Sequence, residues 1–239
     1  MKLLFLDTEA TGLDLATDRL CQVCYKVGDE LRNEYFKPPV PISVKAMSIS
    51  HVTNKMVADK PAFADSDMKK ELETLLPDSI LVAHNVAFDA GILEVEGLKV
   101  PHRIDTLKVS RELDADDLIP EHKLQFLRYY YDLDVDATAH DAKGDVLVLE
   151  AVFGKLMEKM QETIPDREKA IERMMEITRL PSMVRRFMFG KYFGKKVEEV
   201  AEFDRGYLEW LLAQKMQSAD VQREEDWIYT LNHYLGVPQ

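Results

Sequence analysis

The chain has 239 residues, of which 46% are hydrophobic and 31% are charged, so it can form a packed core and is not a disordered protein. Its formal net charge of −12 excludes a protein that coats nucleic acid or anionic lipid through bulk positive charge. Residues 178–239 are neutral overall, so a local nucleic-acid contact stays open there. Neither a membrane span of ~20 apolar residues nor a signal-peptide core is visible, and we expect a cytoplasmic protein with no membrane partner.

The first third of the chain predicts strands before helices. A strand is expected over residues 2–7, and a hairpin over 20–38 turns at Gly28-Asp29. Three further elements follow in order: a loop with short helical pieces (40–61), an amphipathic helix that stops near Pro77 (64–78) and a short buried strand (79–83).

The middle of the chain is mainly helical in pattern. We expect helices from about Ala87 to Gly97, over 106–113 and over 122–131, and a long helix from just after His140 toward Gln161. Strands that lead and then alternate with helices predict an α/β domain, in which helices cover both faces of a mixed sheet.

A charged helical connector is expected next, between Pro165 and Pro181. From Ser182 the pattern changes to a small hairpin followed by helices, which predicts a small C-terminal α+β domain. The predicted division is therefore a main domain over 1–163, a connector over 164–181 and a C-terminal domain over 182–239.

Two cysteines form a C-x-x-C pattern in "RLCQVCYKV". This segment alternates as a strand does, so Cys21 and Cys24 point to opposite faces and cannot share a metal ion. No second cysteine pair completes a zinc site. We therefore interpret both as ordinary buried thiols.

The segment "FLDTEATGL" places Asp7 and Glu9 two residues apart on a strand that is otherwise apolar. Both side chains leave the same face, and two unpaired carboxylates in a core are very unfavourable. Either a cation lies between them or the strand leaves the core at Asp7 and the carboxylates meet water. Oxygen donors favour Mg²⁺ or Mn²⁺ as that cation.

Further polar residues occur in similar settings. Asp89 lies in the first turn of a helix that directly follows a buried strand, and Asp145 precedes the apolar stripe of the long helix. Each is also an ordinary acid near a helix start. If the four acids converge, they suit a site for two metal ions that performs phosphoryl displacement. His140, five residues before Asp145, has the side chain to deprotonate an attacking water.

Three motifs carry a resemblance to a known family. "FLDTEATGLD", "LVAHNVAFDAGIL" and "AHDAKGD" resemble the motifs of DEDD exonucleases, and His140 with Asp145 places the chain in the branch that has histidine in the last motif. The resemblance implies an RNase H-like fold with a five-stranded mixed sheet. It also implies that the four acids are metal ligands for two Mg²⁺ ions, which Mn²⁺ can replace, and that His140 is the general base. One departure is Ala10, where many relatives have threonine.

The C-terminal segment adds to this resemblance. "FGKYFGKK" and "VAEFDRGYLEWL" are similar to the C-terminal domain of the exodeoxyribonuclease X family, and "PISVKAMSIS" through "MVADKP" is similar to an earlier segment of that family. Basic and aromatic residues also alternate in the tail, as they do in single-strand binding surfaces. The alternative is that the aromatic residues form a small core. We expect Phe187 and Phe189 to be core residues and Lys191 and Lys195 to face DNA.

Contacts to the terminal nucleotide follow from the family resemblance alone. The expected residues lie in the turn after the first motif, in the segment 47–51 and beside the second motif; they are Thr8, Leu13, Met47, His51, Asn85 and Phe88.

The sequence therefore predicts a metal-dependent 3′→5′ exonuclease that releases 5′-mononucleotides from DNA ends, single-stranded or double-stranded. Three alternatives remain open: a 3′→5′ exoribonuclease, a proofreading subunit of a polymerase, and a noncatalytic nucleic-acid-binding adaptor on the same fold. Oligomeric state is not determined by the sequence, and a homodimer is one option.

Overall fold

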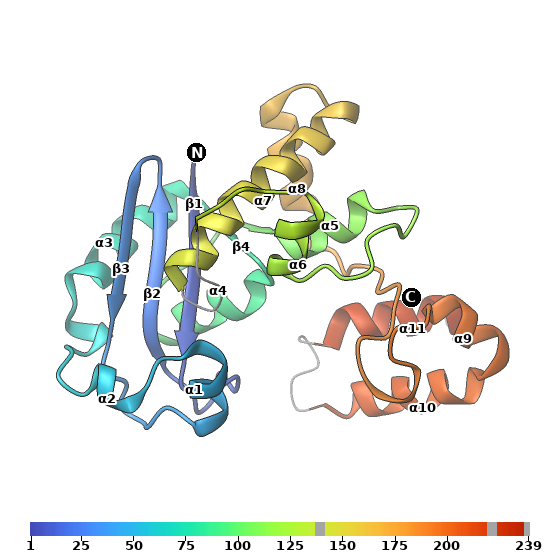
Figure 1. The fold of residues 1–239 in the computed structure, drawn as a ribbon, viewed down its shortest axis with the longest axis horizontal. Coiled ribbons are helices and arrows are strands. Elements are labelled where there is room, and N and C mark those ends of the chain that lie inside the picture. The colour runs from blue at the N-terminus through green and yellow to red at the C-terminus, as the bar shows by residue number, and fades with distance from the viewer. Residues whose placement is uncertain (137–141, 219–223, 237–239) are drawn as a thin grey trace.

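The computed structural model describes residues 1–136, 142–218 and 224–236, and its centre is a sheet of five strands (Figure 1). The strands are β1 (Lys2–Ala10), β2 (Leu20–Val27), β3 (Glu30–Tyr35), β4 (Ser79–Ala83) and β5 (Arg103–Asp105). Their order in the sheet is β3-β2-β1-β4-β5. β1 pairs antiparallel with β2 and parallel with β4, so the predicted mixed sheet is confirmed.

β1 extends beyond the end of its parallel neighbour, β4. Its pairing with β4 ends where Phe5 lies opposite Val82, whereas its pairing with β2 continues until Ala10 lies opposite Leu20. The last residues of β1 therefore have a strand neighbour on one side only. The first turn of α4 (Val86–Val95), which follows β4 in the chain, lies on the other side.

Helices cover both faces of the sheet. The remaining α-helices are α1 (Val44–Ser50), α2 (Asn54–Val57), α3 (Asp67–Leu75), α5 (Thr106–Leu113), α6 (Leu124–Tyr130), α7 (Ala142–Thr163), α8 (Arg167–Arg179), α9 (Val197–Phe203), α10 (Arg205–Met216) and α11 (Glu225–Leu235). Three short 3-10 helices are η1 (Phe63–Asp65), η2 (Leu76–Asp78) and η3 (Gly190–Tyr192). The predicted hairpin turn at Gly28 is confirmed, and Gly28 has a φ of +58°, which favours glycine.

The alternation of β1 builds two cores on opposite sides of the sheet. Leu4 and Leu6 pack against α3 and α4. Phe5 packs on the other side, in a core formed by α5, α6, α7 and α8. The cysteines separate as predicted, because Cys24 belongs to this second core while Cys21 packs with Ile42 beside α1.

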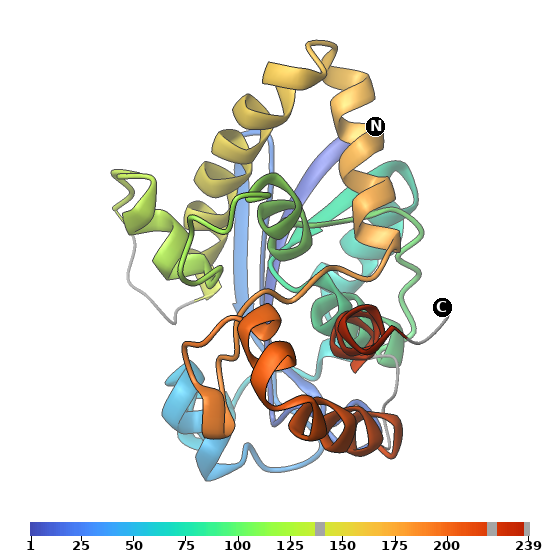
Figure 2. The same cartoon turned by 90° about the vertical axis from the view of Figure 1, so that its right-hand side faces the viewer.

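The last helices form a third core of their own, seen at the lower right of Figure 1. Phe187 is fully buried at its centre, among side chains from α9, α10 and α11. The predicted hairpin is reduced to a single antiparallel bridge between Arg186 and Lys196. Ion pairs join α5 to α11: Lys108 lies 2.6 Å from Glu225, and Arg111 lies 2.8 Å from Asp226. In Figure 2 the C-terminal group, which is formed by α9, α10 and α11, lies below the hairpin of α7 and α8.

Within the described ranges, every helix is too short or too polar to span a bilayer.

Candidate active site

The second half of β1 carries the first two predicted ligands. Asp7 lies opposite Cys24 in the strand register, and Cys24 and Phe5 belong to the core on the α7 side. Asp7 and Glu9 therefore point toward the α7 side of the sheet, beyond the point where the apolar packing ends. The sequence prediction that both carboxylates leave one face is confirmed.

The helix α7 brings a third predicted ligand toward the same place. Phe153 of α7 meets Phe5 edge to face, with ring centroids 5.4 Å apart. Asp145 precedes Phe153 by two turns of helix, about 12 Å, and Asp7 and Glu9 follow Phe5 by about 7 and 14 Å of strand. In Figure 1 the start of α7 lies toward the end of β1, so Asp145, in the first turn of α7, lies on the same side of this ring contact as Asp7 and Glu9.

Asp89 reaches β1 from the opposite direction, in the first turn of α4. Its Oδ1 accepts hydrogen bonds from the Thr8 backbone N–H at 2.9 Å and from the Thr8 hydroxyl at 2.7 Å. The carboxylate thus takes the place of the missing β4 partner of Thr8. Burial raises the pKa of Asp89, and the two hydrogen bonds from Thr8 act in the opposite direction. A bound cation would also favour the ionised form.

Asp145 is held by a neighbouring helix, since its Oδ1 accepts a hydrogen bond of 2.5 Å from Nε2 of Gln125 in α6. His140 lies outside the described residues. Within the described ranges, no three His, Cys, Asp or Glu side chains lie close enough together to form a ready-made metal site. The donor set itself fits a hard divalent cation, because every predicted ligand supplies carboxylate oxygen.

A cavity of about 380 Å³ adjoins Glu9. Leu13 and Phe88, two predicted substrate contacts, line it, while Thr8 is buried against Asp89. Lys45 and Ile49 of α1 also line this cavity, although sequence reasoning did not select them.

Met47 and His51, the expected substrate contacts in the segment 47–51, lie outside this cavity. Met47 packs against the small core that contains Val52, and His51 ends α1 with a φ of 59°. Neither is among the described residues that line the cavity. Helical periodicity explains the difference: Met47 turns inward, so its neighbours Ala46 and Ile49 face the cavity.

Asn85 lies at the start of α4 with a left-handed φ of 70°, and its backbone N–H donates to Oδ1 of Asp105 at 3.0 Å. Asp105 also caps α5 by accepting from the N–H of Leu107, and burial raises its pKa. Asn85 lines a second cavity, which differs from the cavity that Phe88 lines. Sequence reasoning did not select Asp105, although its position directly before a predicted helix is a capping signal.

The tail differs in part from its prediction. Phe187 is a core residue as predicted, but the prediction for Phe189 was wrong, because its side chain is 37% exposed and meets Trp227 edge to face. Lys191 lies 3.0 Å from Asp204, and Lys195 lies over the ring of Phe203 at 6.0 Å. Both lysines therefore have partners within the tail, and a contact with DNA stays a prediction.

Two families match this chain. Residues 4–153 match the RNase T exonuclease family, and residues 187–215 match the exodeoxyribonuclease X-like C-terminal family. The chain therefore belongs to the exonuclease family, and it is a hydrolytic exonuclease with the RNase H-like fold.

Individual relatives agree with this assignment. Exodeoxyribonuclease 10 of Escherichia coli K12 is 31% identical over 96% of this chain and 97% of its own length. The structure titled Exonuclease X in complex with 5′ overhanging duplex DNA is 26% identical, with a TM-score of 0.56, and covers 74% of this chain and 99% of that one. The DNA polymerase III PolC-type of Staphylococcus haemolyticus is 27% identical over 65% of this chain, but over only 11% of its own length.

Proposed function

We propose that this protein is a 3′→5′ exodeoxyribonuclease that uses two Mg²⁺ ions, replaceable by Mn²⁺, and releases 5′-mononucleotides from DNA. The observation that carries the proposal is the placement of Asp7, Glu9, Asp89 and Asp145 on β1 and on the two helices beside it. Similarity to exodeoxyribonuclease 10 over nearly the full length of both chains supports DNA as the substrate. The fold shared with Exonuclease X bound to DNA supports it further.

Each proposed residue has one task. The four carboxylates would hold the metal ions, which when bound would supply Lewis-acid activation of the attacking water and neutralisation of the leaving 3′-oxygen. His140 accepts the proton of that water. Thr8 positions Asp89 through its two hydrogen bonds. Gln125 holds Asp145 through the hydrogen bond from its Nε2.

The terminal nucleotide is proposed to occupy the cavity beside Glu9. Its apolar wall of Leu13 and Phe88 suits a base and a sugar, and Lys45 offers positive charge for a phosphate. Thr8, Met47, His51 and Asn85 remain proposed contacts from the family resemblance, as do Lys191 and Lys195 in the tail. We also retain the division into a main domain (1–163), a connector (164–181) and a C-terminal domain (182–239). A cytoplasmic location remains a proposal.

The first experiment incubates the protein with a 5′-labelled single-stranded DNA oligonucleotide and Mg²⁺. A ladder that shortens from the 3′ end is expected, and EDTA or Asp7→Ala should abolish it. Asp65→Ala is the matched control, because Asp65 is an exposed acid distant from β1 in the chain. His140→Ala should lower the rate by roughly 10²–10⁴-fold without unfolding the protein.

The same assay separates the alternatives. Faster shortening of an RNA oligonucleotide of equal sequence would indicate an exoribonuclease. Binding of DNA and of RNA without any shortening would indicate an adaptor and would overturn the proposed activity.

A further inference from the structure

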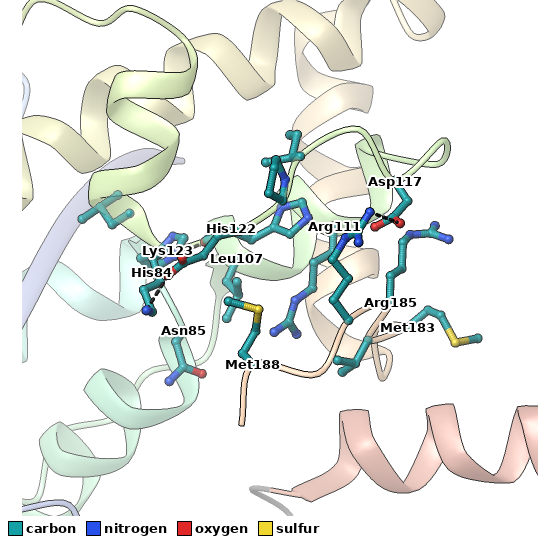
Figure 3. A pocket seen from close by; sticks show the side chains of 16 residues that line it. His84, Asn85, Leu107, Arg111, Asp117, His122, Lys123, Met183, Arg185 and Met188 are labelled. Atoms are coloured by element: carbon teal, nitrogen blue, oxygen red, sulfur yellow. Dashed lines mark hydrogen bonds and ion pairs between the residues drawn. The ribbon is translucent and has the colours of Figure 1, made fainter. Parts of the chain in front are cut away.

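A second cavity lies where the main fold meets the C-terminal group. It has a volume of about 410 Å³. Its walls come from the end of β4, from α5, from the loop before α6 and from the segment 183–188 that leads into the C-terminal core (Figure 3). Apolar side chains form much of its surface, among them Leu107, Ile119, Met183 and Met188.

Positive charge exceeds negative charge on these walls. The cationic residues are Arg111, Lys123, Arg185 and Arg186, and the acidic residues are Asp117 and Glu121. The carboxylate of Asp117 has two cations, Arg186 at 2.9 Å and Lys196 at 2.7 Å, so this cluster keeps a positive charge. Glu121 is paired with Lys123, and Arg111 with Asp226.

Arg185 is the cation without an acid partner. Among the described residues it makes no ion pair and no hydrogen bond, and its Nε is buried without an acceptor. A buried donor of this kind costs free energy unless a ligand or water supplies an acceptor. An arginine beside an apolar wall suits a phosphate group that is joined to a sugar and a base.

The position of the cavity indicates which phosphate of a DNA strand Arg185 would contact. Phe88 lines the cavity beside Glu9, whereas Asn85 lines the cavity of Arg185, so both cavities adjoin the start of α4. Asp89, a proposed metal ligand, lies in the first turn of α4. A strand whose 3′ end lies beside Glu9 and which passes over this turn therefore enters the cavity of Arg185.

We propose that this cavity binds a backbone phosphate of the substrate strand, upstream of the cleaved bond, through the Arg185 guanidinium. The proposal rests on the proposed exonuclease function. It adds a site that binds the DNA strand where the main fold meets the C-terminal group. Each phosphate contact to a single strand contributes to the salt dependence of binding. Loss of the contact should therefore be visible in affinity, in salt dependence and in the length of DNA required.

The test measures the Kd of 5′-labelled oligo(dT) from two to ten nucleotides, in EDTA so that no cleavage occurs. Arg185→Ala is compared with Arg179→Ala, which removes the same charge from an exposed position at the end of α8. We expect Arg185→Ala to weaken binding of the decamer roughly tenfold and to leave the dinucleotide unchanged. The slope of log Kd against log salt should fall by about 0.7, and Arg185→Lys should lie between Arg185→Ala and wild type.

Three results would overturn the proposal. Equal affinities of Arg185→Ala and Arg179→Ala at every length would remove Arg185 from the DNA path. An equal loss for dinucleotide and decamer would place Arg185 at the terminal nucleotide. Competition by dTMP or inorganic phosphate with the affinity of the decamer would indicate a site for free nucleotides. In each case wild-type protein still shortens DNA if the proposed function holds, so failure of the two proposals is distinguishable.

Discussion

Replacing His84 by glutamine tests the environment at the end of β4. Nε2 of His84 lies 2.8 Å from the backbone oxygen of His122, and Nδ1 lies 2.9 Å from the hydroxyl of Thr106. A carbonyl oxygen only accepts, so Nε2 carries the proton when the ring is neutral. Burial first, and then the charge of Arg111, lowers the pKa of His84 from 6.5 to about 4, although the hydrogen bond to His122 acts in the opposite direction.

The sign and size of the effect follow from this pKa. Between pH 6.5 and about 4 the unfolded chain binds the proton and the folded chain does not. The contribution of a neutral His84 is therefore complete above pH 6.5 and is lost as the pH falls toward 4. At pH 5.5, one unit below the unfolded pKa, the loss amounts to about 1.4 kcal/mol.

His84→Gln keeps an amide N–H for the oxygen of His122 but has no group that titrates in this range. Urea unfolding followed by circular dichroism at pH 7.5 and pH 5.5 measures both proteins. Wild type should lose about 1.4 kcal/mol more free energy of unfolding than the variant over this interval. The other titrating groups are shared and cancel in the comparison. An equal loss in both proteins would show that His84 is not held neutral by the fold.

The remaining predictions concern the core, the Thr8–Asp89 contact and the cysteines. Phe187→Ala should lower the free energy of unfolding by about 3–5 kcal/mol because its ring is fully buried, whereas Phe193→Ala, at a side chain 67% exposed, should change it little; urea titrations of both variants decide this. Thr8→Val removes the hydroxyl donor to Asp89 and should cost about 1–3 kcal/mol in the same measurement, with Thr8→Ser close to wild type. Iodoacetamide at pH 8 should modify neither cysteine until urea is added, because both are buried and burial raises the pKa of Cys21 to about 12; labelling of the native protein, read by mass spectrometry, would contradict this.

Local patterns were enough to predict much of the fold. The two-residue period of a strand predicted that Asp7 and Glu9 share one face, and Gly28 marked the hairpin turn. The strand β5 was not predicted individually because it has three residues and no apolar run. Its position depends on pairing with β4, which is a long-range contact.

The sequence predicted the acidic residues of the site but not the residues that form hydrogen bonds with them. Gln125 donates a hydrogen bond to Asp145, although the two residues are 20 positions apart in the sequence. No sequence periodicity predicts such a pair. Arg185 and Asn85 line one cavity although they are distant in sequence, so their relation depends on how the C-terminal segment crosses the main fold. Phe187 and Phe189 both contact Trp227, but Phe187 is enclosed by side chains of α9, α10 and α11 whereas Phe189 lies at the edge of that core, and the pattern of aromatic residues alone does not predict this difference.

The difference in length between β1 and β4 has a consequence for where this protein tolerates added residues. A longer β4 would extend the pairing along β1 and push the first turn of α4, with its Asp89, away from Thr8. An inserted peptide at the β4–α4 junction should therefore abolish activity, even where the protein still folds. The hairpin tip at Gly28-Asp29 lies beyond the last paired residues of β2 and β3, where an affinity tag or a fluorescent label can be introduced without disturbing the catalytic end.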